Sequence, residues 1–194
     1  MAKLKEFLAK NKEILIPTVT LFLICFVITA ALGVTNFFTA GQIAALEKKT
    51  QDEAMNLLLP ADEYAVIEDS TSYCAVKNNE TIGYVFITSE KGYGGEIRVM
   101  TAVNLDGSVK AVTVLAADDE TPGLGQNVTK KSFLDRYTGH FKGIAVVKNN
   151  ADSSLNQIDA STGATISSRA TTKAVNKALE LYENIVNTAS KEVA

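Results

Sequence analysis

The sequence has few of the side chains that form disulfides or bind metals. Its 194 residues include two cysteines, Cys25 and Cys74, and one histidine, His140, and no Cys-x-x-Cys spacing occurs. Cys25 lies in a long apolar run and Cys74 begins a predicted strand, so we expect no pairing between them and interpret Cys74 as a small core residue. The pattern argues against a disulfide framework and a metal cluster, and His140 is interpreted as a polar residue after a short helix.

A concentrated charge of one sign is also missing. The formal net charge is −3, and acidic and basic residues are interspersed. Nucleic-acid-binding proteins carry a basic patch or stripe, so no nucleic-acid partner is expected. No nucleophile–base pair and no pair of acid–base carboxylates emerges, which argues against a chain that turns over a soluble substrate alone.

Apolar residues are abundant near the N-terminus. No charged residue occurs in the 21 residues from Ile14 to Val34, and a helix needs about 20 residues to cross the hydrocarbon core of a membrane. Pro17 lies near the start of this run, where a helix tolerates proline best. We expect a transmembrane helix over residues 14–34. Because Ala30 and Ala31 also fit a cleavage site, a signal peptide that is removed is the alternative.

The charges before the apolar run predict its orientation. Four lysines precede it against two glutamates, and basic flanks stay on the cytoplasmic side: Lys3, Lys5, Lys10 and Lys12, with Glu6 and Glu13. We therefore predict a single-pass protein of the cell (inner) membrane with residues 1–13 in the cytoplasm. Residues 35–71 are assigned to a linker and an amphipathic helix, and residues 72–194 to an extracytoplasmic domain.

The outer part of the chain alternates between helical and strand patterns. Residues 42–59 have apolar positions at helical spacing and end at Pro60, which predicts a stalk or a packing helix. Four strand-like segments follow, with tight turns between them: residues 72–77, 81–89, 96–104 and 108–116. Short strands joined in this way predict an antiparallel sheet.

Two helices, one strand and one loop complete the domain. Residues 128–137 predict a short helix, residues 144–148 a further strand, and residues 163–189 a long helix with apolar residues at helical spacing. The proline and glycines of residues 120–125 predict a tight loop with exposed backbone N–H groups. We assign the fold class α+β, with an antiparallel-sheet domain and packed helices.

The start of the last helix is the most informative segment. It has the sequence Asp159-Ala160-Ser161-Thr162-Gly163-Ala164-Thr165. The first N–H groups of a helix lack intrahelical partners and carry partial positive charge, so such an end binds anions and phosphate above all. Ordinary N-capping by Ser161 or Thr162 is the alternative interpretation.

These residues resemble the attachment signature Asp-x-x-Thr-Gly-Ala-Thr of the FMN-binding domain family. A second segment, residues 120–125, is similar to the family's Glu-Thr-Pro-Gly-Leu-Gly loop, which lies against the flavin, and the glycine-rich turn at residues 92–95 also occupies the family's position. The resemblance implies that a flavin transferase joins FMN covalently to Thr165 through a phosphoester, with Asp159 part of the signature that the transferase recognises. Stabilisation of the helix start by the Asp159 carboxylate is the structural alternative.

The resemblance also implies a set of cofactor-binding residues in both segments. The loop is expected to contribute apolar contact from Leu124 to the flavin ring and polar contacts from Glu120 and Thr121. Lys148 is placed near the electron-rich edge of the ring, with a solvated strand-end lysine as the alternative. The full predicted set is Thr165, Asp159, Ser161, Thr162, Gly163, Ala164, Glu120, Thr121, Gly123, Leu124 and Lys148.

Within the family, the short connection between anchor and domain resembles the G subunit of the Rnf complex. This implies an electron relay that works with other membrane subunits, in a complex that couples electron flow between ferredoxin and NAD to ion transport. The C subunit of a sodium-pumping NADH:quinone oxidoreductase is one alternative. A non-redox single-pass adaptor or assembly protein, in which residues 161–165 only cap a helix, is another.

Overall fold

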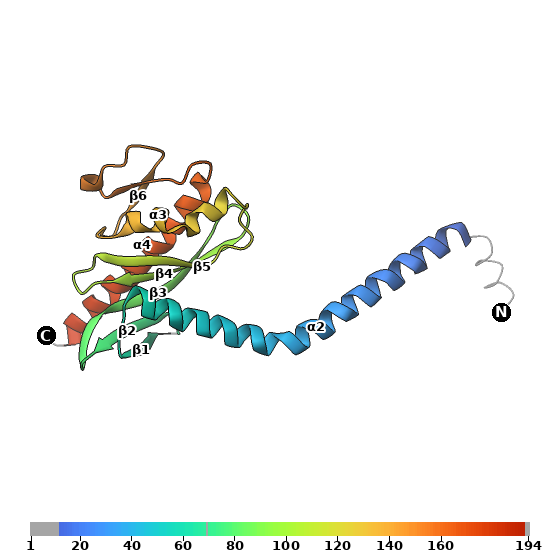
Figure 1. Ribbon diagram of the computed structural model, residues 1–194, viewed down its shortest axis with the longest axis horizontal. Helices are drawn as coiled ribbons and strands as arrows, with labels where there is room; N and C mark the ends of the chain where they lie inside the picture. Colours follow the sequence, from blue (N-terminus) through green and yellow to red (C-terminus); the bar gives the residue numbers. More distant parts are fainter. Residues whose placement is uncertain (1–11, 69, 193–194) are drawn as a thin grey trace. The chain divides into compact units, whose positions relative to one another are not determined.

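The computed structural model describes residues 12–68 and 70–192, in two compact units that meet between Lys49 and Thr50. Helix α2 (Lys12–Leu58) continues through this boundary (Figure 1). The expected linker at its centre is helical instead, since no proline lies between Pro17 and Pro60. Hydroxyl groups there bond back to carbonyls four residues earlier, Thr35 to Ala31 at 2.9 Å among them. Such bonds are compatible with a continuous helix.

The N-terminal part of α2 is long and apolar enough to cross a membrane, and within the described residues it is the one helix that meets this criterion. Large apolar side chains are exposed along it, including Phe22 and Phe26. Exposed apolar side chains all round a helix suit a lipid environment rather than water.

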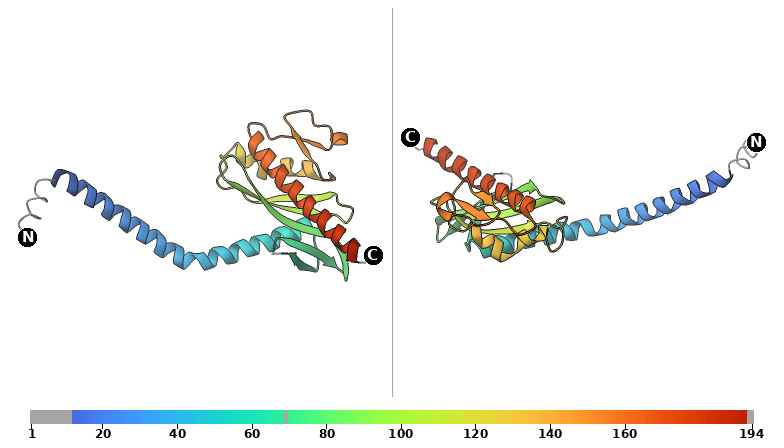
Figure 2. Two further views of the ribbon diagram at one scale, coloured as in Figure 1. Left: turned by 180° about the vertical axis from the view of Figure 1, so that it is seen from behind. Right: turned by 90° about the horizontal axis from the view of Figure 1, so that it is seen from above.

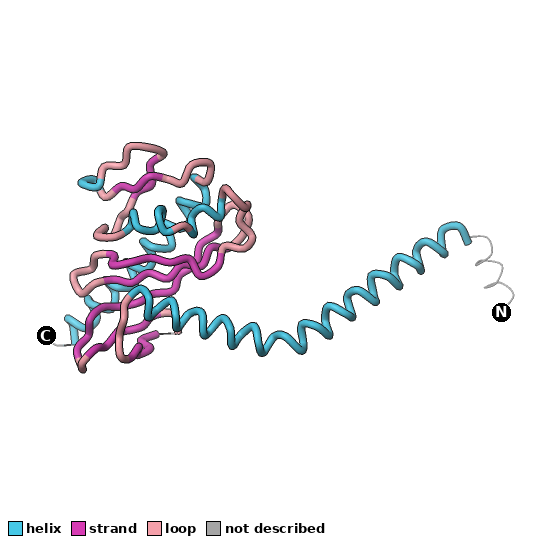
Figure 3. The backbone as a smooth tube through the Cα atoms, in the orientation of Figure 1, coloured by secondary structure: helices cyan, strands magenta, loops and turns pink. Residues whose placement is uncertain are grey.

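The second unit contains a five-stranded antiparallel sheet in which neighbours in sequence are neighbours in space (Figure 3). Its strands are β1 (Glu63–Glu68), β2 (Ser72–Lys77), β3 (Glu80–Lys91), β4 (Glu96–Val103) and β5 (Val109–Ala116). The four predicted strands are confirmed as β2 to β5. The turn between β4 and β5 is closed by Gly107, whose φ of 85° favours glycine, and by Asp106, which accepts the Ser108 N–H at 2.8 Å.

Strand β1 was not predicted. Its residues lie within the segment assigned to a linker and helix, 35–71, so that assignment is wrong for them. The strand pairs with β2 in the register Glu63↔Val76. As an edge strand it leaves Val66 and Ile67 exposed on both faces, and its sequence therefore lacks the alternation that marks a half-buried strand.

The two faces of the sheet have separate cores because successive strand residues point to opposite sides. Helix α4 (Thr165–Glu192) covers one face, against Phe86, Val99 and Val103 (Figure 2). The last residues of α2 cover part of the other face, where Met55, Leu58 and Leu59 pack with side chains of β2 to β4. Other apolar residues of the expected amphipathic helix, Leu57 among them, are exposed.

The predicted helix at residues 128–137 forms as three short segments. These are η1 (Gly125–Thr129), α3 (Lys131–Leu134) and η2 (Asp135–Tyr137). The break comes at Lys130, whose backbone is extended (φ −70°, ψ 136°). Burial of Val128, Phe133 and Tyr137 in the α4 core anchors the pieces, so tertiary packing replaces helical continuity.

A small two-stranded parallel sheet precedes α4. Strand β6 (Ala145–Val147) confirms the prediction at residues 144–148, whereas its partner β7 (Gln157–Asp159) was not predicted and has only three residues. The turn η3 (Ser153–Leu155) lies between them. Strand β7 leads directly to the start of α4.

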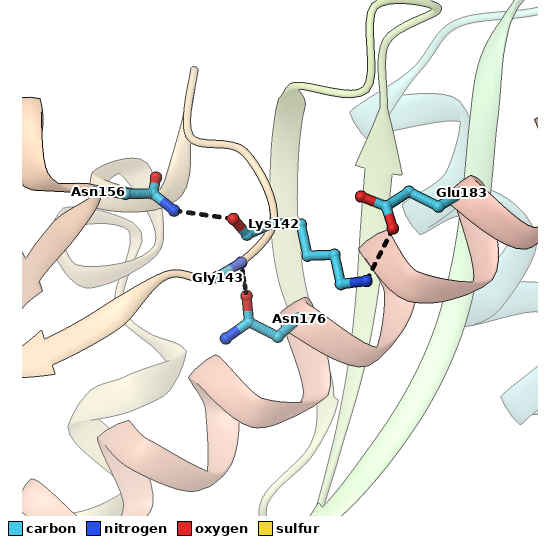
Figure 4. A network of polar contacts seen from close by, with 5 residues as sticks. All are labelled: Lys142, Gly143, Asn156, Asn176 and Glu183. Atoms are coloured by element: carbon cyan, nitrogen blue, oxygen red, sulfur yellow. Dashed lines mark hydrogen bonds and ion pairs between the residues drawn. The ribbon is translucent and has the colours of Figure 1, made fainter.

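Asn176 fastens this small sheet to the middle of α4 (Figure 4). Its Oδ1 accepts the N–H groups of Gly143 and Ile144 at 3.0 and 2.9 Å, and its Nδ2 donates to the Ile144 carbonyl at 2.9 Å. Nearby, Lys142 forms an ion pair with Glu183. Asn156, whose φ is 55°, donates to the carbonyls of Phe141 and Lys142. One helix thus supports both the main core and the small sheet.

We expect Asn176→Ala to lower the free energy of unfolding by about 2 kcal/mol, because it removes three hydrogen bonds worth roughly 1 kcal/mol each, and water compensates only in part. Urea unfolding of the detergent-solubilised chain, followed by tyrosine circular dichroism, measures this. Asn184→Ala, exposed on the same helix, is the matched control and should change stability by less than about 0.5 kcal/mol. Equal effects of the two substitutions would contradict the role of Asn176.

Candidate functional site

The turn before α4 holds the first N–H groups of the helix free. Gly163 has a φ of 76°, and the Ala164 N–H bonds to the Ser161 carbonyl at 2.9 Å. Ser168 closes the turn, since its Oγ accepts the Ser161 N–H at 3.0 Å and donates to the Ala164 carbonyl at 2.8 Å. Among the described residues, the N–H groups at positions 165–167 have no acceptor. They are therefore available to an anion.

The capping alternative does not hold. Neither the Ser161 nor the Thr162 hydroxyl bonds to an N–H of the first turn within the described part of the chain. The carboxylate of Asp159 has a hydrogen-bond partner away from the helix start. Its Oδ1 accepts the Ala151 N–H at 2.9 Å, so the carboxylate stabilises the loop between β6 and β7.

Arg136 holds the strand that enters the turn. Its Nη1 donates to the Asp159 carbonyl at 2.6 Å and to the Ala160 carbonyl at 3.4 Å, and its guanidinium lies over the Phe133 ring. The Ala160 N–H bonds in turn to the Val147 carbonyl at 2.8 Å. These contacts position the backbone that leads into residues 161–165.

The second motif folds into a tight loop beside the first. The N–H groups of Leu124 and Gln126 both bond to the Thr121 carbonyl, and Gly123 has a φ of 76°. A Cβ added at Gly163 would lie 2.9 Å from Cδ2 of Leu124. The Leu124 side chain therefore packs against the glycine of the attachment signature, so the two motifs meet.

Glu120 joins this loop to two other segments. Its side chain is 1% exposed, its Oε1 accepts the Gly94 N–H at 2.9 Å, and its Oε2 accepts the Ser167 hydroxyl at 2.6 Å. The carboxylate thus links the loop to the glycine-rich turn after β3 and to the first turn of α4. The prediction that Glu120 contacts the flavin edge differs from this arrangement, in which hydrogen bonds within the chain engage both oxygens.

Glycine is required where the chain closes around this carboxylate. A Cβ at Gly92 would lie 2.2 Å from Oε1 of Glu120, and one at Gly125 would lie 2.2 Å from Oε2. Burial by itself raises the pKa of Glu120, but hydrogen bonds from Ser167 and from the backbone of Gly94 and its neighbours outweigh burial and lower the pKa. The group is therefore ionised at neutral pH.

The three segments enclose a pocket of about 500 Å³, within the usual range for small-molecule sites. Its lining residues are Tyr93, Glu120, Thr121, Leu124, Gly125, Gly163, Ala164, Thr165, Ile166 and Ser167. Tyr93, Leu124 and Ile166 are exposed apolar side chains, and Thr165 is half-buried. The pocket combines apolar walls with the free N–H groups of a helix start.

Most of the predicted site residues gather here. Six line the pocket: Thr165, Gly163, Ala164, Glu120, Thr121 and Leu124. Ser161, Thr162 and Gly123 lie in the same two loops but are not part of the lining. Asp159 lies at the end of β7, and Lys148 is exposed just after β6, so the structure brings neither of them to the pocket.

Sequence reasoning missed four lining residues. Tyr93 and Gly125 lie within segments that were identified, so their position was available from the motifs. Ile166 is one of the apolar residues at helical spacing in the last helix, and that spacing does not reveal that it is 55% exposed and lines the pocket. Ser167 has no distinguishing pattern in the sequence, since only its bond to Glu120 reveals it.

Comparison with known proteins agrees with this geometry. The model of the FMN-binding domain family matches residues 92–180, which contain every lining residue of the pocket. The G subunit of the Na(+)-translocating ferredoxin:NAD(+) oxidoreductase complex of Acetobacterium woodii is 34% identical over 85% of this chain and 89% of its own. The G subunit of the proton-translocating complex of Clostridium ljungdahlii is 36% identical over 89% and 95%.

The chain belongs to the family of these G subunits. The family extends to Methanosarcina acetivorans, in which the G subunit of an ion-translocating oxidoreductase complex is 30% identical over 89% of this chain and 96% of its own. Among solved structures, Shewanella oneidensis NqrC aligns with 54% of this chain and 52% of that chain, at 25% identity and a TM-score of 0.49.

The pocket of this G-subunit family member suits FMN. A phosphate group matches the free N–H groups at the start of α4, where the helix dipole adds partial positive charge. Gly163 allows close approach to the backbone, and Tyr93, Leu124 and Ile166 offer apolar surface to an aromatic ring system. When bound, FMN supplies one-electron and two-electron chemistry, and the protein supplies position and electrostatics.

We expect Glu120→Gln to lower the free energy of unfolding by about 2 kcal/mol near neutral pH, because the amide has one acceptor oxygen: one charge-assisted hydrogen bond is weakened and the acceptor of the other is replaced by an N–H donor. A carboxyl whose pKa is lowered by folding stabilises the protein above its unfolded pKa, and this contribution is lost as pH falls through the folded pKa. The difference between the native chain and the variant should therefore shrink as the pH falls below the ordinary pKa of a glutamate. Urea unfolding over this range measures it.

Asp118→Asn is the matched control, since Asp118 is exposed two residues away in the same segment. Its effect should stay below about 0.5 kcal/mol at every pH. A destabilisation by Glu120→Gln that is constant from neutral to acid pH would contradict an ionised Glu120.

Proposed function

We propose that this chain is the membrane-anchored flavoprotein subunit of an ion-translocating ferredoxin:NAD oxidoreductase complex, and that it carries FMN on Thr165 through a phosphoester. In this role the chain relays electrons between other membrane subunits, and the complex couples that electron flow to ion translocation. Its curated relatives are G subunits of such complexes, over most of the length of both chains. The complex as a whole is the enzyme, and this chain is its electron carrier.

The observation that carries the proposal is the position of Thr165. It is the first residue of α4, lines the pocket, and follows the turn that leaves the neighbouring N–H groups free. A phosphoester at its hydroxyl puts the phosphate beside these donors. The link leaves the flavin ring unmodified, so its purpose is retention. Where free FMN is scarce, a noncovalent site loses its cofactor by mass action.

Asp159 and Lys148 have different roles in this proposal. A flavin transferase recognises Asp159 as part of the signature, although the folded chain uses its carboxylate to close a loop. Lys148 lies outside the pocket lining, so nothing in the described site favours its contact with the flavin over the alternative of a solvated lysine. Ser161 and Thr162 act by shaping the turn.

The distribution of charged residues also supports an orientation of the chain in the membrane. The four lysines before the apolar run place the N-terminus in the cytoplasm and the flavin domain outside the cell (inner) membrane. This placement agrees with covalent attachment, because a cofactor outside the cytoplasm is not readily replaced.

We expect Thr165→Ala to abolish covalent flavin and leave the domain folded, since alanine is well tolerated in a helix. Intact mass measures this, because covalent FMN adds roughly 438 Da by formula less water. The chain must be co-expressed with a flavin transferase and exported. Thr162→Ala, three residues away in the same turn, is the matched control and should keep the adduct. An adduct that survives in Thr165→Ala and disappears in Thr162→Ala would move the attachment to Thr162.

We expect protease added outside intact cells, with any outer layer permeabilised, to remove the domain from about residue 40 onward, because the lysine bias orients the span. Tags at the two ends are followed by immunoblot. The C-terminal tag should disappear and the N-terminal tag should persist on a short fragment. Protection of the C-terminal tag until the cells are lysed would show the opposite orientation.

A further inference from the structure

The pocket contains one charged side chain, that of Glu120. Every other lining residue is neutral. Among the described residues no lysine or arginine forms an ion pair with this carboxylate. A buried charge ordinarily pairs with an opposite charge, because burial without compensation is costly. A buried anion whose partners are all neutral is therefore unusual, and its presence in the pocket requires an explanation.

The partners of Glu120 hold its charge without cancelling it. The Gly94 N–H and the Ser167 hydroxyl are neutral donors, so the site keeps a net charge of −1. Glycines at positions 92 and 125 bring the backbone close on both sides, which leaves the carboxylate 1% exposed and immobile. The partial positive charge at the start of α4 compensates for it in part. The same helix end also faces the proposed phosphate on Thr165.

We propose that Glu120 is a fixed buried anion that positions the three walls of the pocket and lowers the reduction potential of the flavin bound there. The inference rests on the proposed function, since it requires FMN in this pocket. Glu120 is a positioning residue in this proposal: its oxygens are engaged by the chain, and it acts on the cofactor through its field. An electron that enters the flavin adds negative charge near a carboxylate that cannot move away.

The expected effect follows from Coulomb's law. The repulsion between an added electron and a fixed carboxylate disfavours reduction of the flavin, and in a protein interior an interaction of this kind is on the order of a tenfold change in the equilibrium. For a one-electron step a tenfold change corresponds to about 59 mV. The carboxylate also stabilises the pocket through its hydrogen bonds, and this second effect must be separated from the first.

The test compares variants of the full flavin-loaded chain in detergent by redox titration followed by visible absorbance. Glu120→Gln keeps the shape and removes the charge, so the one-electron equilibrium should shift about tenfold towards the reduced flavin, which is a rise of ~59 mV in the midpoint potential. Ser167→Ala keeps the charge and removes a donor, so its potential should not rise. Asp118→Asn removes an exposed charge outside the pocket lining, and it should leave the potential unchanged.

An unchanged potential in Glu120→Gln, with flavin content intact, would overturn the proposal. An equal rise of the midpoint potential in Ser167→Ala would also overturn it, because loosening of the pocket walls would then explain the change in both variants. Absence of flavin from the unsubstituted chain would instead contradict the proposed function, so the two failures differ. The unfolding midpoint of each variant is measured in parallel to record loss of the hydrogen bonds.

A second measurement needs no variant, in case Glu120→Gln fails to hold flavin. Infrared difference spectra between the reduced and oxidised chain, with and without isotope-labelled glutamate, report protonation of a carboxyl group. A fixed anion shows only a perturbed carboxylate stretch from glutamate. A labelled carboxylic acid C=O band on reduction would show that a glutamate takes up a proton, and since Glu120 is the one glutamate among the described lining residues, this would overturn the proposal.

Discussion

The unpaired N–H groups at the first turn of α4 are the constraint on which the site depends. A helix end without partners is stable only if water, a side chain or a ligand satisfies it. In this chain Ser168 closes the turn from inside the helix, and the hydroxyls of Ser161 and Thr162 leave the first N–H groups free. The helix that presents them is held along its length by the sheet and by Asn176. The free N–H groups of its first turn are therefore held in a fixed position.

The remaining walls are positioned relative to this helix by one carboxylate. Glu120 connects the loop that follows β5, the turn that follows β3 and the first turn of α4. These segments are far apart in sequence, and two of them are glycine-containing loops that the link connects to the helix. Because the partners are neutral, the same bonds that order the pocket leave a net negative charge in its wall. Glu120 thus contributes both to the arrangement of the pocket walls and to the charge of the pocket.

Sequence patterns predicted the elements that bury alternating or helical faces. The strands β2 to β5 and helix α4 have clear periodicity, and the motifs at residues 120–125 and 159–165 meet as expected. Strand β1 and strand β7 were missed because an edge strand and a three-residue strand bury too little to leave a pattern. Ile166 fits the helical spacing of the apolar residues, yet its neighbours Ser167 and Ser168 are buried and Ile166 itself is exposed at the pocket. Asp159 and Ser167 depend on partners that only tertiary structure brings near.

The chain consists of an apolar helix and a compact domain, which suits an electron carrier that is tethered to a membrane. A membrane anchor keeps the domain at the surface where other membrane subunits lie, and the phosphoester that we propose would keep the flavin in the domain. Tethering raises the effective concentration of a reaction partner without any added contact surface. The exposed apolar side chains of Tyr93, Leu124 and Ile166 lie at the pocket itself. With the proposed covalent link, the noncovalent contacts of the pocket would be free to set the potential, because affinity for the flavin would no longer have to come from them.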